Sequence, residues 1–166
     1  MLKKLFGKKE EVSKTFTVVA HLTGQVIELG DVPDPVFAQS MMGDGMAINP
    51  ENGKVVAPVD GEIIQVFPTK HAIGIKTKNG AEILLHIGIE TVGLKGEGFN
   101  VFVKEGDKVN TGDILVEFDF ALVTDKAAST ITPIIITNGD DVASITKHSV
   151  GHVTAGETPM MEITMK

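Results

Sequence analysis

The sequence has no cysteine, tryptophan or tyrosine, and each of its 15 Lys or Arg positions is a lysine. Without cysteine the chain has no disulfide, no thiolate nucleophile and no sulfur ligand for a metal ion, which suits a reducing compartment. Arginine is the usual planar clamp for phosphate and for transition-state charge. Its absence argues against a kinase or phosphatase that works on its own.

A basic charge balance and long apolar runs are also missing. The formal net charge is -7 at pH 7, whereas proteins that bind nucleic acids carry a basic footprint. No apolar run approaches the length of a membrane span. We therefore expect a soluble, cytoplasmic protein that does not bind nucleic acid.

Residues 1–14 differ in character from the rest of the chain. They are rich in lysine, with Leu2, Leu5 and Phe6 at helix-like spacing, and they lack the apolar segment of a secretory signal. A flexible tail is the favoured interpretation, because termini are rarely ordered unless tied down. Weak contact with a membrane surface is the alternative. Residues 15–166 fit a single domain.

Short β-branched runs separated by Gly, Asp and Asn predict an all-β fold. The run at 18–29 recurs at 55–66 with the same internal spacing. One strand-turn-strand unit used twice predicts an antiparallel β-sandwich or flattened barrel. In this alignment His21 takes the place of Pro58, between strands, so we interpret His21 as structural.

Two short helices interrupt the predicted strands. Asp34 followed by Pro35 is typical of an N-cap residue before the first helical position. The apolar residues within 120–128 predict a second short helix.

The segment 69–91 reads as one hairpin that carries two of the five histidines. Asn79-Gly80 is the strongest short signal for a two-residue turn. If Lys78 pairs with Ala81, then His86 lies opposite Ile73. His71 would then be diagonal to His86 on the same face, with the Cβ atoms somewhat under about 7 Å apart. The spacing predicts a histidine pair.

The same register places Ile73, Ile75 and Leu84 on the histidine face. That face is an apolar collar that a partner covers, or it is one side of a buried strand pair. A three-residue loop would destroy this histidine pairing, because a one-residue slip moves a side chain to the opposite face.

Three chemical hypotheses follow from these residues. A neutral imidazole is a good nucleophile, so one histidine could accept a phosphoryl group while the other donates to its oxygens and Thr69 fixes that second ring. Alternatively His71 and His86, or His148 and His152, could bind zinc, although metalloprotease motifs are absent. Two histidines could also bind zinc adventitiously when a partner adds a carboxylate.

The third hypothesis is a swinging-arm carrier. Residues 103–117 followed by Asp125-Lys126-Ala127 look like a lipoyl domain with Lys126 as the acceptor. In lipoyl domains the lysine lies in a tight hairpin directly after a strand. Here residues 118–124 intervene, and their apolar pattern fits a short helix better.

Several separated motifs together resemble one family. The repeat, Gly43-Asp44-Gly45, 69–72, 85–89, 96–99 and 156–159 resemble the glucose-class enzyme IIA of the bacterial phosphoenolpyruvate-dependent sugar phosphotransferase system. The resemblance covers about 15–166. It implies an antiparallel β-sandwich and phosphoryl transfer from the phosphocarrier protein HPr to the enzyme IIB domain of a sugar permease. The resemblance also implies that no cofactor is required and that the protein binds and regulates other permeases and metabolic enzymes.

The resemblance also assigns residues. His86 matches the phosphorylated histidine, which reacts through Nε2, His71 matches the histidine that supports the phosphoryl group, and Thr69 matches the threonine bonded to it. Phe37 and Phe67 match apolar residues of the partner-binding face, and Asp34 matches an acidic residue at its rim. Glu90 departs from the family, in which Asp is common at this position.

Overall fold

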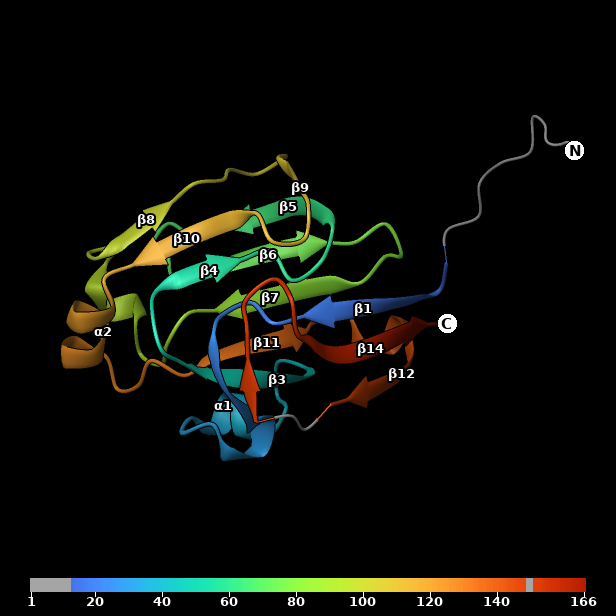
Figure 1. The fold of residues 1–166 in the computed structure, drawn as a ribbon, viewed down its shortest axis with the longest axis horizontal. Helices are drawn as coiled ribbons and strands as arrows, with labels where there is room; N and C mark the ends of the chain where they lie inside the picture. The colour runs from blue at the N-terminus through green and yellow to red at the C-terminus, as the bar shows by residue number, and fades with distance from the viewer. Residues whose placement is uncertain (1–12, 149–150) are drawn as a thin grey trace, which may run out of the picture.

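The computed structural model describes residues 13–148 and 151–166 (Figure 1). The predicted tail, apart from its last two residues, and its membrane alternative therefore lie outside the described residues. Within them, no helix is long and apolar enough to cross a membrane.

Strands account for most of the regular structure. They are β1 (Thr15–Val19), β2 (Gly24–Glu28), β3 (Asp44–Pro50), β4 (Lys54–Val56), β5 (Gly61–Val66), β6 (Ala72–Lys76), β7 (Glu82–His86), β8 (Phe99–Val101), β9 (Lys108–Val109), β10 (Ile114–Phe118), β11 (Thr132–Ile136), β12 (Val142–Lys147), β13 (His152–Val153) and β14 (Pro159–Met165). The helical segments are α1 (Pro35–Ala38), α2 (Phe120–Lys126), η1 (Leu29–Asp31), η2 (Val92–Leu94) and η3 (Gly139–Asp141).

The strands form three antiparallel sheets. The large sheet has the order β13-β2-β3-β11-β7-β6-β5-β9, and the two small sheets have the orders β1-β14-β12 and β4-β10-β8. In Figure 1 the small sheets lie in front of the large one. The prediction of an antiparallel all-β sandwich is confirmed.

The internal repeat is visible in the hydrogen bonds. Val19 N–H donates to the Pro58 carbonyl and Val56 N–H donates to the His21 carbonyl, both at 3.0 Å. Val19 matches Val56 and His21 matches Pro58 in the repeat, so in each bond the same position of one copy donates to the same position of the other copy. The repeat units also hold matching places in the large sheet, since β2 and β5 are each second from an edge. The two halves therefore pack with approximate two-fold symmetry.

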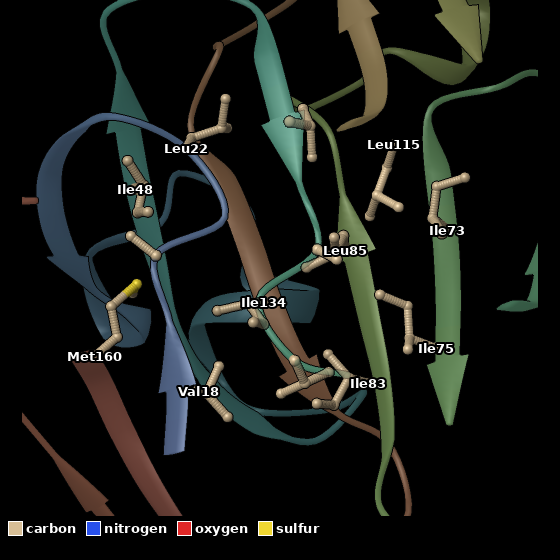
Figure 2. Packing of buried hydrophobic residues seen from close by; sticks show 14 of the residues in the cluster. Val18, Leu22, Ile48, Ile73, Ile75, Ile83, Leu85, Leu115, Ile134 and Met160 are labelled. Carbon is tan, nitrogen blue, oxygen red and sulfur yellow. The ribbon is translucent and has the colours of Figure 1, made fainter. Parts of the chain in front are cut away.

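Strand alternation divides the apolar side chains of the large sheet into two layers. Ile73 and Ile75 of β6 join Ile83 and Leu85 of β7 in the core between the sheets, as Figure 2 shows. The intervening residues face the other way. On that outer face a second cluster forms, made of Leu29, Val32, Phe37, Ala47, Ala72, Leu84, Ile89 and Ile135. We call it the outer cluster. Both faces of the hairpin are therefore buried.

Both predicted helices are present. The Asp34 carboxylate accepts from Val36 N–H at 2.8 Å and so caps α1, and Asp119 caps α2 in the same way through Leu122 N–H at 3.0 Å. Lys126 ends α2 and lies 3.8 Å from the Glu97 carboxylate. The swinging-arm hypothesis is wrong in its geometry, because this lysine is on a helix rather than in a hairpin turn.

The predicted register of the hairpin was wrong by one residue. His86 pairs with Ala72, and Ile73 pairs with Leu85. The cause is a three-residue loop, closed by the Thr77 hydroxyl, which accepts from Ala81 N–H at 3.1 Å. Consequently Ile73 and Ile75 lie on the core face and not with the histidines, whereas Leu84 keeps the predicted face.

His21 is fully buried, as expected for a structural residue, and its Nε2–H donates to the Thr132 carbonyl at 2.9 Å. Burial lowers the pKa of His21 from 6.5 to about 4. Between these pH values the unfolded chain binds more protons, so this residue destabilises the fold as pH falls from 6.5 toward 4 and has no such effect above 6.5.

His21→Gln tests this coupling, because glutamine keeps a side-chain N–H donor but does not titrate. From the size of the pKa shift, the wild type should lose about 2 kcal/mol more unfolding free energy than the variant between pH 7.5 and pH 5. Urea unfolding of both proteins at the two pH values measures the difference. Equal losses would contradict the buried, neutral state of His21.

Candidate functional site

The two histidines of the hairpin converge on the outer face of the large sheet. His86 is the last residue of β7 and His71 immediately precedes β6. Their ring centroids lie 4.8 Å apart, with the ring planes at 81°. The predicted histidine pair is therefore confirmed, although its register was not.

A turn before β6 explains how His71 reaches this face. In the observed register His71 faces Ile87, whose N–H donates to the His71 carbonyl at 2.6 Å, and regular alternation would point the His71 ring toward the core. The alternation stops here, because Lys70 adopts a left-handed conformation with φ of 65°. The Phe67 carbonyl accepts from Lys70 N–H at 2.7 Å and closes the turn.

The Gly88 carbonyl fixes the tautomer of His86. His86 Nδ1 lies 2.8 Å from this oxygen. A carbonyl only accepts hydrogen bonds, so Nδ1 carries the proton and Nε2 keeps its lone pair. The bend that brings the carbonyl back to the ring needs glycine, because Gly88 has φ of 71° and a Cβ there would lie 2.6 Å from Thr91 Cγ2.

Thr69 holds the second ring. Its hydroxyl oxygen lies 2.6 Å from His71 Nδ1. When the hydroxyl donates to Nδ1, the proton of a neutral His71 is on Nε2. The pair then offers one nitrogen with a lone pair, on His86, and one N–H donor, on His71.

Burial keeps both histidines neutral near pH 7. The pKa of His71 is lowered to about 4, mainly by burial and further by repulsion from His86. The pKa of His86 is also lowered by burial, although its bond to the Gly88 carbonyl and the negative charge of Asp34 oppose the shift. A neutral ring is the form that can act as a nucleophile.

Aromatic and aliphatic side chains enclose the pair. The Phe37 ring lies 4.8 Å from His86, and the Phe67 ring lies 5.6 Å from His71 in an edge contact. Leu84 belongs to the outer cluster beneath them. Within α1 and shortly after it, Val36, Met41 and Met42 expose large apolar side chains. Ile73 is fully buried on the core side of the sheet, which corrects its predicted place on the surface that a partner contacts.

Of the two acidic residues that the sequence singled out, Asp34 lies near the pair and Glu90 follows His86 by four positions. Asp34 caps α1 and is close enough to His86 to raise its pKa, which agrees with its predicted place at the rim. Glu90 is exposed and left-handed, with φ of 59°. Asp and Asn adopt that conformation more readily than Glu, so the backbone gives a physical reason for an aspartate at this position.

The zinc hypothesis gains no support from the geometry. In the described part of the chain, no group of three or more His, Cys, Asp or Glu side chains could hold a metal ion. His152, on β13, instead pairs with the Glu51 carboxylate at 2.8 Å. His148 lies after β12 and is not brought to the hairpin histidines in the sheet order.

Two residues that hold the site escaped sequence reasoning. Gly88 contributes a carbonyl, which any residue possesses, so no side-chain signal marks it. Thr132 lies 44 residues from Gly88, and its hydroxyl accepts from Gly88 N–H at 3.2 Å. Only the pairing of β11 with β7 brings them together.

His86→Ala should raise the pKa of His71, because the variant removes the repulsion from a second ring. The pKa should stay below 6.5, since burial is the larger cause. NMR titration of the His71 ring protons measures the shift, and His152→Ala serves as the matched control. No change in His71 on removal of His86 would contradict the coupling.

Comparisons with known proteins point to one family. A family model described as phosphoenolpyruvate-dependent sugar phosphotransferase system, EIIA 1, matches residues 16–142. A PTS system glucose-specific EIIA component from Halalkalibacterium halodurans is 57% identical over 169 residues, which cover 98% of each chain. One from Staphylococcus aureus is 53% identical over 165 residues, which cover 99% of each.

A solved structure is similar as well. The glucose permease IIA from Mycoplasma capricolum superposes with a TM-score of 0.80 at 44% sequence identity, over 89% of this chain and 95% of that one. Fold, sequence and family model agree over most of the chain. It therefore belongs to the EIIA 1 family of the phosphoenolpyruvate-dependent sugar phosphotransferase system and is a phosphotransferase component of that system.

Proposed function

We propose that this chain carries a phosphoryl group on His86, accepting it from phospho-HPr and passing it to the enzyme IIB domain of a glucose-type permease. The observation that carries the proposal is the bond from His86 Nδ1–H to the Gly88 carbonyl, which leaves Nε2 as the reactive atom. The names of the relatives support the glucose class. Such a carrier works in the cytoplasm and needs no cofactor.

The transfer step uses the lone pair of Nε2. That pair forms the new N–P bond while the bond between phosphorus and the donor breaks and its electrons stay with the donor. The His86 ring then carries a positive charge with its proton still on Nδ1. The Gly88 carbonyl and the Asp34 charge both favour this cationic ring. When the next protein attacks phosphorus, the electrons return to Nε2 and neutral imidazole leaves.

His71 stabilises the phosphoryl group without reacting. Its Nε2–H donates to a phosphoryl oxygen, and the bond to Thr69 fixes the direction of that donor. Because the chain has no arginine, this N–H takes a role that a guanidinium often has. The added negative charge raises the pKa of His71 and strengthens the same hydrogen bond.

The surrounding apolar residues form the docking surface. Phe37 and Phe67 pack against the rings, and Leu84 belongs to the outer cluster with Phe37. Val36, Met41 and Met42, in and just after α1, add exposed apolar side chains. A docked partner covers this surface and excludes water, which limits hydrolysis of the phosphoryl group. The contact suits transient partners, since each must leave after one transfer. Ile73 supports the sheet from below.

His86→Ala should abolish phosphoryl uptake, because the variant has no nucleophile at the site. His71→Gln should accept the group but pass it on at least tenfold more slowly, since it lacks the oriented imidazole donor. Intact mass after incubation with phosphoenolpyruvate, enzyme I and HPr measures uptake, and loss of the added mass on addition of a IIB domain measures transfer.

His152→Ala is the matched control for these variants, since that histidine is paired with Glu51 on the edge strand β13. It should gain one acid-labile phosphoryl group as the wild type does. Stoichiometric uptake by His86→Ala would refute the proposed function.

The rate of uptake should depend weakly on pH around neutrality. Because the pKa of His86 is lowered, its Nε2 stays unprotonated down to the ordinary histidine pKa of about 6.5 and somewhat below it. Single-turnover uptake from a fixed stock of phospho-HPr, measured from pH 8 to pH 5, should be flat and then fall below pH 6.5. A midpoint above 6.5 would contradict the lowered pKa.

A further inference from the structure

The two peptide groups that flank Gly88 have all four polar atoms bonded. Gly88 N–H donates to the Thr132 hydroxyl at 3.2 Å, and the Gly88 carbonyl accepts from His86 at 2.8 Å. Ile87 and Ile89 complete the set, with the Ile87 carbonyl accepting from the Thr91 hydroxyl at 2.5 Å and Ile89 N–H donating to the Ser129 carbonyl at 2.9 Å. The loop that carries the Gly88 carbonyl is fixed on both sides.

The Thr132 side chain supplies a hydrogen-bond acceptor where the pairing of β11 with β7 ends. The last pair between β11 and β7 is Ile134 with Leu85. One step further along this register, Pro133 faces His86, and proline has no N–H to offer either neighbouring strand. The ladder therefore stops beside the reactive histidine. The Thr132 side chain then accepts the Gly88 N–H that a strand carbonyl would otherwise bind.

The orientation of the Thr132 hydroxyl is itself determined. Its O–H donates to the Thr130 carbonyl at 2.9 Å, so its lone pair is free to accept from Gly88. The Thr132 carbonyl accepts from His21 at 2.9 Å, which anchors the residue in the core. Thr132 has no exposed surface. It therefore reaches neither a partner nor a phosphoryl group directly.

We propose that Thr132 is a positioning residue for phosphoryl transfer. Its hydroxyl holds Gly88 so that the Gly88 carbonyl stays on His86 Nδ1, and this keeps the His86 proton off Nε2. The inference rests on the proposed role of His86 as acceptor. Without the hydroxyl the Gly88 N–H loses its buried partner, the loop shifts, and the other tautomer, which carries its proton on Nε2, becomes accessible.

Thr77 provides a matched control at the far end of the same hairpin. Like Thr132 it is buried, and its hydroxyl accepts a loop N–H, that of Ala81 at 3.1 Å. Thr77→Val and Thr132→Val each remove a hydroxyl that accepts a backbone N–H at one end of the β6–β7 pair, and Thr132→Val also removes the bond to the Thr130 carbonyl. A purely structural hydroxyl should behave alike at both places.

Two readouts test the proposal. Nitrogen-15 NMR of labelled histidine reports which nitrogen of His86 carries the proton, independently of phosphorylation. Single-turnover uptake from phospho-HPr reports the rate. Thr132→Val should increase the fraction of His86 protonated on Nε2 and slow uptake roughly three- to tenfold, the effect expected from loss of the bond to Gly88 N–H. Thr132→Ser should restore both values, and Thr77→Val should change neither.

The opposite result is equally clear. A folded Thr132→Val with wild-type tautomer and rate would overturn the proposal. If valine prevents folding, Thr132→Ala carries the same test with a smaller side chain. Exchange of the Gly88 amide proton in the wild type needs no variant, and exchange as fast as that of a free amide would also overturn it. Wild-type protein that takes up no phosphate would reject the proposed function, while the NMR readout still tests the positioning of His86.

Discussion

The hydrogen bond from His86 Nδ1–H to the Gly88 carbonyl is the interaction on which the site depends. It joins residues only two positions apart, yet it decides which nitrogen of the ring can react. The bond needs a left-handed glycine, an end to the strand at His86, and a loop held in place by surrounding hydroxyl and carbonyl groups. The glycine is a near neighbour of His86 in the chain, but the end of the strand and the fixed loop also depend on β11 and the segment before it, which are distant in sequence. The sheet therefore supports a single tautomer of His86.

The apolar environment of the pair serves a second purpose. Burial lowers the pKa values of His71 and His86, and two neutral rings can lie 4.8 Å apart without the repulsion that two imidazolium ions would suffer. Other apolar side chains in and after α1, those of Val36, Met41 and Met42, are exposed and suit contact with a protein partner. Under the proposed function, a phosphoryl group on His86 brings negative charge beside His71 and favours the protonated His71 ring. The charge of the site thus changes between its two chemical states while its packing need not.

Sequence reasoning reached the fold and the pair by different routes. The repeat at 18–29 and 55–66 was sufficient for the sandwich, because alternation and spacing survive in both copies. The pair was predicted from an incorrect register: a three-residue loop, closed by the Thr77 hydroxyl, shifted the strands. It formed nevertheless because left-handed Lys70 turns the chain just before His71. The alternation of side chains between two faces holds within a strand but not beyond its end. The histidine pair lies at such an end.

The contribution of Thr132 could not have been predicted from the sequence, and the reason is physical. A hydroxyl that accepts a backbone N–H has no characteristic spacing, and here its partner is 44 residues away. The neighbouring Pro133 is the one local sign, since it marks a place where the sheet cannot continue. If no acceptor followed the end of the β11–β7 pairing, Gly88 N–H would be buried without a partner. The free energy of folding would then be less favourable by about the value of one hydrogen bond. A side-chain acceptor beside that proline keeps the loop rigid, and rigidity there is what keeps the reactive nitrogen free.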